Sequence, residues 1–385
     1  MNDIIKKYQL GLAEHFQAAN AFTFWKGRVS LYAILKSLDV GEGDEIILPG
    51  YTCVMDVNPI KYLGAKPVYV DIEPDTFNIN VDLLEGKITP NTKVIIAQHT
   101  YGYVCDMDGI LEIAARKGVT VIEDCCLCVG STFKGKLAGT FGKAAYFSGQ
   151  WNKPFTTGLG GIVTTSDEEL AVVLAELCEK ELCQPSAKEV FMLFAQLAVY
   201  RAFIYPRTTA LAQSLFRWLT KKGIVVGSSS TAEFVPEMAP DFFKAMSSVQ
   251  ARSGVAQLKK LNKNIAHRRA MANLYDEMLT AKGWTPRQYD KSVMDPVMVR
   301  YPVRINEKQE ALAQAASAGV ELGSWFECPL HPIETPLQAY DYTPGQCPEA
   351  EKASLEVVNL PLHPRAIKKT VAKTVDFITN FTQPS

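Results

Sequence analysis

The chain has 385 residues, of which 47% are hydrophobic and 21% are charged, and its formal net charge is −1. This composition is typical of a globular protein with enough chain for two domains, and it offers no broad basic field for nucleic acid. Nine cysteines, an odd number, indicate a reducing compartment rather than a disulfide framework. The first residues, MNDIIKKYQLGLAEHF, lack the apolar core of a signal peptide, so we expect a cytoplasmic protein.

From about residue 45 the sequence alternates short apolar runs with helical patterns. The runs are EIILP (45–49), KPVYVDI (66–72), KVIIAQH (93–99), VTVIED (119–124), AAYFS (144–148) and GIVTT (161–165). One intervening amphipathic stretch, MDGILEIAARKG, ends at Gly118, a residue typical of a helix C-cap. The alternation predicts an α/β fold with a mostly parallel sheet covered on both faces. Ligands of such sheets bind at the carboxyl ends of the strands.

The segment at about 180–235 interrupts this pattern. Residues 189–204, EVFMLFAQLAVYRAFI, are strongly apolar, but Arg201 and Pro206 follow too soon for a membrane span of roughly 18 residues. Phe216 and Trp218 lie among basic residues further on. Two interpretations of 189–222 stay open. It is a helical pair buried in the protein or in a subunit contact, or an amphipathic element that rests on a membrane surface.

The pattern of the C-terminal part is poorer in strands. Residues 246–282 have helical periodicity and predict one long helix or two. VMVRYPVRI (297–305) and LEVVNLPL (355–362) have the character of strands, and RAIKKTVAKTVDFITNF predicts a closing helix. We therefore predict a large domain over residues 1–254, with a helical insert at about 180–235, and a smaller mixed α/β domain over residues 255–385.

A single lysine, Lys153, precedes a proline in FSGQWNKPFTTGLGG, among the aromatic residues Phe147, Trp151 and Phe155. The residue before a proline is pushed out of the α region, so Lys153 is expected on an irregular, fixed loop. Burial among aromatic side chains favours the neutral amine, which is the nucleophilic form.

Four further residues are expected at the same edge of the sheet. Asp124 ends a buried strand, where its carboxylate needs a cationic partner. Ser148 ends the next strand, and Gly27 and Arg28 begin the helical stretch KGRVSLYAILKSL, whose free N–H groups favour an anion. Taken singly, each is more often a cap, a turn or a small residue. Together with a lysine they fit pyridoxal phosphate.

The chain resembles the DegT/DnrJ/EryC1/StrS family of sugar aminotransferases, which have fold type I among pyridoxal phosphate enzymes. The resemblance covers nearly the whole chain and is weakest over 180–235. The motifs that carry it are GDEIILPGYT, GAKPVYVDIEPDTFNI, ITPNTKVIIAQHTYG, DMDGILEIAARKG, VIED, FKGKLAGTFG, Phe-Ser followed by Lys153, GGIVTTSDEELA, GSWFECPLHPI and CPEAEKASLEVVNLPLHP. It implies a seven-stranded-type sheet and a homodimer with active sites at the subunit interface. It also implies L-glutamate as amino donor and a nucleotide-linked keto-sugar as acceptor.

Residue by residue, the resemblance gives Lys153 the role of the Schiff-base lysine, Asp124 that of the partner of the pyridinium nitrogen, and Ser148 that of a phosphate ligand. Gly27 and Arg28 match the family's Gly-Thr phosphate turn. The arginine is a departure that adds a guanidinium for the phosphate.

Other departures surround the cofactor ring. Leu127 stands where the family carries Gln or His, Cys53 where an aromatic residue commonly stacks on the ring, and Pro154 where an Asn follows the lysine. Phe243 replaces an Asn that reaches the phosphate of the neighbouring subunit, and the adjacent Lys244 is our candidate for that contact. These changes indicate a divergent subgroup.

The remaining candidates are assigned with less detail. Gln150 is predicted to contact the cofactor, and Tyr101, Trp151 and His331 the substrate. The sequence CCLC (125–128) resembles half of a metal site, but no second pair of cysteines completes four ligands, so we predict buried thiols and no metal.

The sequence thus predicts a pyridoxal-phosphate-dependent aminotransferase that acts on a keto-sugar. Some relatives are dehydratases in which histidine replaces the lysine, and the retained Lys153 favours transamination. Three alternatives stay open: a related dehydratase or lyase, a cyclitol aminotransferase, and a non-catalytic sensor or scaffold with the same fold.

Overall fold

The computed structural model describes residues 3–151, 153–200, 234–286, 289–332 and 335–384. Its centre is a seven-stranded sheet of order β1-β10-β9-β6-β5-β2-β4. The strands are β1 (Asn20–Phe24), β2 (Glu45–Pro49), β4 (Lys66–Val70), β5 (Thr92–Gln98), β6 (Thr120–Asp124), β9 (Ala144–Ser148) and β10 (Gly161–Thr165). The pairs from β4 to β9 are parallel, and β10 is antiparallel to both β9 and β1. The predicted α/β class and mostly parallel sheet are confirmed.

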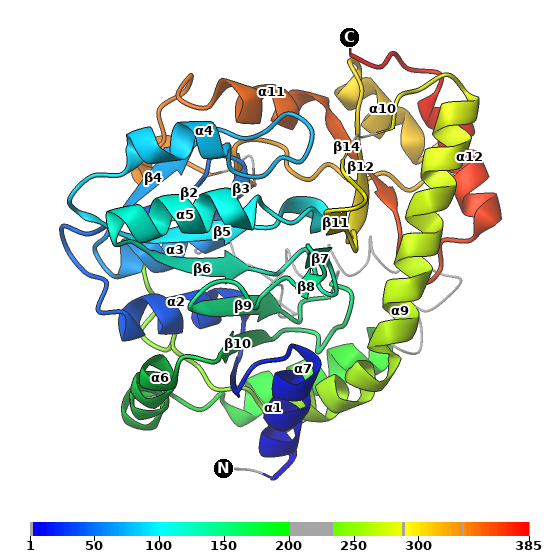
Figure 1. Cartoon of the computed structure of the whole chain (residues 1–385). Helices are drawn as coiled ribbons and strands as arrows, with labels where there is room; N and C mark the ends of the chain where they lie inside the picture. The colour runs from blue at the N-terminus through cyan, green and yellow to red at the C-terminus, as the bar shows by residue number, and fades with distance from the viewer. Residues whose placement is uncertain (1–2, 152, 201–233, 287–288, 333–334, 385) are drawn as a thin grey trace.

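Helices cover both faces of this sheet (Figure 1). They are α1 (Asp3–His15), α2 (Gly27–Ser37), α3 (Val54–Tyr62), α4 (Val81–Leu84), α5 (Met107–Lys117), α6 (Glu168–Glu181) and α7 (Ala187–Val199), with the 3₁₀ turns η1 (Glu85–Lys87) and η2 (Thr100–Gly102). Alternate residues of β2 enter different cores, since Ile46 packs in the cluster with α2 and Ile47 in the cluster with α5. This is the period of two that a strand buried on both faces requires.

The C-terminal part is built on α9 (Ser248–Ala281), a continuous 34-residue helix (Figure 1). It packs against α1 at one end and α12 (Lys368–Ile378) at the other. The remaining elements are β12 (Arg300–Arg304), α10 (Lys308–Ala315), η5 (Leu337–Tyr340), α11 (Pro348–Glu356) and β14 (Val357–Pro361). Strands β12 and β14 form an antiparallel pair. The predicted domain boundary at residues 254–255 falls inside α9 and stays a prediction.

Two small sheets join distant parts of the chain. β3 (Thr52–Cys53) pairs in parallel with β13 (Leu330–His331), and β7 (Thr132–Phe133) lies between β8 (Lys136–Leu137) and β11 (Met294–Asp295). The first of them brings a C-terminal loop against the carboxyl edge of the large sheet.

Only the first helix of the predicted insert, α7, is described. It begins at a Ser186 capping box, and Leu193 and Leu197 of its inner face are buried against Trp25 and Leu159. Phe216 and Trp218 lie outside the described residues. No helix in the described ranges has both the length and the apolar character to cross a bilayer.

Candidate active site

One cavity of about 290 Å³ lies at the carboxyl edge of the large sheet. All eight residues predicted to bind a cofactor line it, as does His331: Gly27, Arg28, Cys53, Asp124, Leu127, Ser148, Gln150, Lys153 and His331. The structure therefore brings these predicted residues together around one cavity. Other lining residues were not singled out from the sequence, and Met55, Asp56, Gln98, Cys126, Trp325 and Phe326 are among them.

The N-terminus of α2 forms one end of the cavity. Lys26, the residue at its N-cap, makes no side-chain hydrogen bond to the first amides of the helix. A Cβ placed on Gly27 would lie 3.1 Å from both Cβ and Oγ of Ser148, so glycine keeps a notch open between the helix and the hydroxyl. Arg28 is buried beside this notch, and its Nη1 donates to the Met55 thioether. Helix amides, a hydroxyl and a guanidinium together form a suitable cradle for a phosphate.

Asp124 is the last residue of β6, and its buried side chain lines the same cavity. Its Oδ1 accepts the backbone N–H of Cys126 at 2.8 Å, which fixes the carboxyl orientation. Asp56, from the first turn of α3, lines the same cavity, and its Oδ1 accepts the Tyr146 hydroxyl at 3.2 Å. Burial, followed by the charge of Asp124, raises the pKa of Asp56 to about 8.

The loop that carries Lys153 is held by α9. Asn264 donates to the carbonyl of Pro154, Ser253 donates to that of Thr156 at 3.2 Å, and Gln250 donates to that of Leu159 at 2.7 Å. Within the loop, the N–H of Lys153 bonds the carbonyl of Gln150 at 3.0 Å. These hydrogen bonds hold the irregular loop around Lys153 in a defined conformation, which agrees with the fixed loop expected for a residue that precedes a proline.

The aromatic contact of the lysine amine differs from the prediction. Lys153 Nζ lies 5.3 Å from the ring centroid of Trp325, a residue of the C-terminal part. Phe147 and Phe155 belong to the cluster on the other side of the sheet, where Phe16 stacks on Phe147 at 4.1 Å. Alternation along β9 explains the error, because Ser148 faces the cavity and Phe147 must face away.

Trp325 and Phe326 form the wall of the cavity that the C-terminal part contributes, and a circuit of hydrogen bonds holds this wall. The N–H of Phe326 donates to the Tyr51 hydroxyl at 3.2 Å. The Tyr51 hydroxyl lies 3.0 Å from the Tyr101 hydroxyl, and the Tyr101 hydroxyl donates to the carbonyl of Trp325. Lys308 is also buried, and its Nζ donates to the carbonyls of Ser324, Phe326 and Ser354.

Two of the predicted substrate residues do not line this cavity. Tyr101 is fully buried behind the Trp325 wall. Trp151 packs in the cluster under α7, 4.9 Å from the Tyr200 ring. His331 does line the cavity, paired through β13 with Cys53 of β3.

Lys244 is buried and paired within its own chain. Its Nζ lies 2.6 Å from Glu189 and 2.6 Å from Asp241. Burial lowers the pKa of Lys244, but its hydrogen bonds to Asp241 and Glu189 outweigh burial and raise it. A contact with a neighbouring subunit's phosphate would have to compete with both carboxylates.

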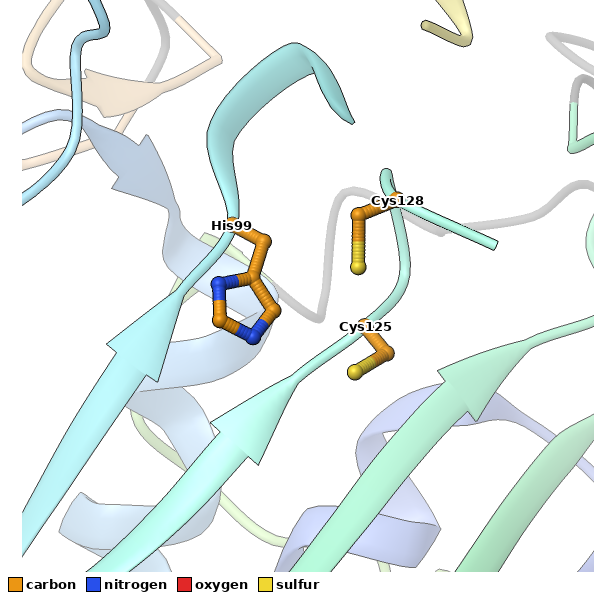
Figure 2. A group of neighbouring side chains, drawn as sticks. All are labelled: His99, Cys125 and Cys128. Carbon is orange, nitrogen blue, oxygen red and sulfur yellow. The ribbon is translucent and has the colours of Figure 1, made fainter. Parts of the chain in front are cut away.

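His99, Cys125 and Cys128 gather behind the cavity, and their potential metal-ligating atoms lie within 4.8 Å of one another (Figure 2). Both ring nitrogens of His99 are occupied. Nδ1 accepts the N–H of Cys105 at 3.1 Å, and Nε2 lies 3.0 Å from Glu123 Oε2. Burial raises the pKa of both thiols, whereas a metal requires thiolates. This arrangement favours a packed thiol cluster.

Comparison with known proteins decides the family. The model of the DegT/DnrJ/EryC1/StrS aminotransferase family matches residues 3–191 and 210–379. This chain belongs to that family. The aminotransferase is 30% identical to the GDP-perosamine synthase of Caulobacter vibrioides over 365 residues, which are 93% of this chain and 85% of the relative. It is 30% identical to the UDP-2-acetamido-2-deoxy-3-oxo-D-glucuronate aminotransferase of Pseudomonas aeruginosa over 355 residues, 92% of this chain and 84% of the relative.

A solved structure of DesV from S. venezuelae in complex with a ketimine intermediate shares the fold of this aminotransferase. The TM-score is 0.75 at 22% identity, over 99% of this chain and 89% of that one. The chain is thus a sugar aminotransferase of fold type I that uses pyridoxal phosphate. The cavity fits this cofactor, because Gly27, Arg28 and Ser148 offer an anion cradle, Asp124 a buried carboxyl group and Lys153 an amine.

Proposed function

We propose that this enzyme transfers an amino group from L-glutamate to the keto group of a nucleotide-linked sugar, through a Schiff base at Lys153. The observation that supports this proposal is the convergence of Lys153, Asp124 and the phosphate cradle in one cavity. The names of both relatives refer to nucleotide-linked sugars, GDP-perosamine and a UDP-linked 3-oxo sugar.

Each residue has a defined task in this proposal. Pyridoxal phosphate supplies, when bound, an aldehyde that captures amines and a ring that withdraws electrons. Gly27, Arg28 and Ser148 bind the phosphate, and the Asp124 carboxylate holds a proton on the ring nitrogen. Lys153 Nζ would hold the cofactor through its aldehyde carbon, with loss of water, and would carry protons to and from the substrate carbon.

The walls around the ring differ in their tasks. Leu127 and Cys53 would offer apolar contact to the ring, since burial raises the pKa of the Cys53 thiol to about 12 and keeps it neutral. Gln150 is the polar group next to Ser148, and its N–H lies 3.4 Å from the Ser148 Oγ. His331 faces the substrate from the C-terminal loop. Tyr101 positions the Trp325 wall through the hydrogen bond to its carbonyl. Trp151 packs under α7 and holds the start of the loop that carries Lys153.

The spectrum of the purified protein, before and after L-glutamate, tests this proposal. We expect a band near roughly 420 nm that moves to about 330 nm with L-glutamate. Lys153→Ala should abolish this response, whereas Lys180→Ala, at an exposed lysine of α6, should keep it. A band that ignores L-glutamate would refute that donor and favour the dehydratase, cyclitol or non-catalytic alternatives. The same band in Lys153→Ala would refute the assigned lysine.

We also propose that the enzyme is a cytoplasmic homodimer with shared active sites, in which Lys244 serves the neighbouring subunit. All nine cysteines lie in described parts of the chain and are free thiols, which supports a reducing compartment. The outer face of α7 carries Phe191 and Phe194, which are 67% and 56% exposed, and a second subunit would cover it. Sedimentation velocity tests the dimer. Co-sedimentation with anionic vesicles, compared with Phe191→Ser, tests the alternative of a membrane contact through 189–222.

A further inference from the structure

A second carboxyl group, Asp56, lies in the cofactor cavity beside Asp124. It belongs to the first turn of α3, which immediately follows Cys53, and it lines the cavity together with Asp124 and Lys153. The local sequence around Asp56 does not indicate this role, because an acidic residue in the first turn of a helix is common as a favourable partner of the helix dipole.

The surroundings of Asp56 link it to the carboxyl at the ring nitrogen. Tyr146 donates its hydroxyl to Asp56 Oδ1 at 3.2 Å. Tyr146 belongs to β9 and is the register partner of Asp124 on β6, so one tyrosine lies next to both acids. Asp124 already accepts the N–H of Cys126 at 2.8 Å. Asp124 thus accepts a backbone N–H, whereas the donor to Asp56 is a tyrosine hydroxyl.

The charged and titratable groups that face Asp56 come from every element packed around it. Burial and the Asp124 charge raise its pKa to about 8, while Lys153, the Tyr146 hydrogen bond and Arg28 act in the opposite direction. The Cys53 and Cys126 thiols beside them have raised pKa values through burial and stay neutral. The cavity therefore holds two carboxyl groups, Asp56 and Asp124, with Lys153 and Arg28 among the groups that surround them.

We propose that Asp56 is the proton-holding residue of the cofactor site: its carboxyl keeps a proton while the phosphate-bearing cofactor is bound, so that Asp124 is the single carboxylate at the ring. The proposal rests on the proposed function. A phosphate bound at α2 offsets the charge of Arg28, and Arg28 is one of the groups that keep Asp56 ionised. Binding removes this effect, and the carboxyl of Asp56 then retains its proton to higher pH.

The sign of the pH dependence follows from linkage. Below about pH 8, Asp56 is protonated before and after binding, so it contributes no pH dependence. Above that pH the free protein must gain a proton to bind, and Asp56 weakens affinity by up to about tenfold per pH unit. Asp56→Asn is neutral at every pH and has nearly the same shape, so it should lack this component.

The experiment measures binding of pyridoxamine 5′-phosphate by isothermal calorimetry between pH 7 and 10, in buffers of different ionisation enthalpy. This probe has the ring and phosphate but no aldehyde, so Lys153 forms no bond with it. We expect the wild type to take up close to one more proton than Asp56→Asn at about pH 9, and to bind about tenfold more weakly than the variant there. Tyr146→Phe removes a hydrogen bond that lowers the pKa of Asp56. In this variant the pH above which affinity begins to fall should therefore be higher than in the wild type.

Equal proton uptake and parallel pH profiles in wild type and Asp56→Asn would overturn the role of Asp56. Failure of the wild type to bind the probe at any pH would instead refute the proposed function. If Asp56→Asn does not fold, the Tyr146→Phe variant provides the test. The inference is contradicted if affinity begins to fall at the same pH in that variant as in the wild type.

Discussion

The notch at Gly27 gives a quantitative prediction about the phosphate cradle. In Gly27→Ala the new methyl group would lie 3.1 Å from Cβ and Oγ of Ser148, closer than ordinary carbon contacts. It would occupy the space between the α2 amides and the hydroxyl, where a phosphate oxygen has to lie. Loss of one charge-assisted hydrogen bond costs about 1.5–3 kcal/mol, so we expect affinity for pyridoxal phosphate to fall about 10- to 150-fold.

The fold itself should tolerate this change. Gly27 is the first residue of α2, and alanine is the better helix former by up to about 1 kcal/mol. The free energy of unfolding of the cofactor-free protein, measured in urea, should therefore change by less than about 1 kcal/mol. Gly86→Ala is the matched control, because a Cβ there meets nothing within 4 Å. Affinity of Gly27→Ala within about threefold of wild type, with the fold intact, would refute the assignment of the phosphate site.

Three further predictions concern the groups that support the cavity. Lys308→Met keeps the aliphatic stem but leaves three carbonyl groups without their donor. The free energy of unfolding in urea should therefore fall by about 3–5 kcal/mol. A decrease below about 1 kcal/mol would contradict these hydrogen bonds. Glu123→Gln removes charge from a carboxylate that accepts the N–H groups of Gly139, Phe141 and Gly142, and should cost about 3 kcal/mol at pH 7 in the same assay, against an unchanged Glu112→Gln. Tyr101→Phe opens the hydrogen-bond circuit at Trp325 and should raise the KM for the sugar more than it changes the spectrum of bound cofactor; equal effects on both would count against a role through the wall.

The strands and the main site residues were accessible from the sequence because local patterns encode them. Three of the six predicted runs, 45–49, 144–148 and 161–165, match β2, β9 and β10 residue for residue, and Gly118 ends α5 in the left-handed conformation. Lys153, Asp124 and Ser148 each follow or end a strand, so the topology of a parallel sheet brings them together. Strand β1 was missed, because NAFTF is short and partly buried and stands apart from the alternating pattern.

The rest of the site depends on contacts between distant segments. Nothing in the local pattern of Trp325 indicates that its ring meets Lys153, because this contact requires β13 to pair with β3. Asp56 looks like an ordinary helix-start residue until β9 places Tyr146 against it. Gln98, the last residue of β5, lines the cavity, whereas His99, which follows it, bonds Glu123 instead. Which of the two neighbours faces the cavity depends on how β5 packs in the sheet.

The pairing of β13 with β3 has a consequence for how the chain unfolds. The same segment supplies the Trp325 wall, bonds Tyr51 and Tyr101, and aligns His331 with Cys53. One hydrophobic cluster also runs from α2 through the Trp325 region to α12. Separating the C-terminal part from the large sheet would thus expose a continuous core and dismantle the cavity in a single event. The melting of the protein should therefore be one cooperative transition, and the cofactor should raise its midpoint without splitting it.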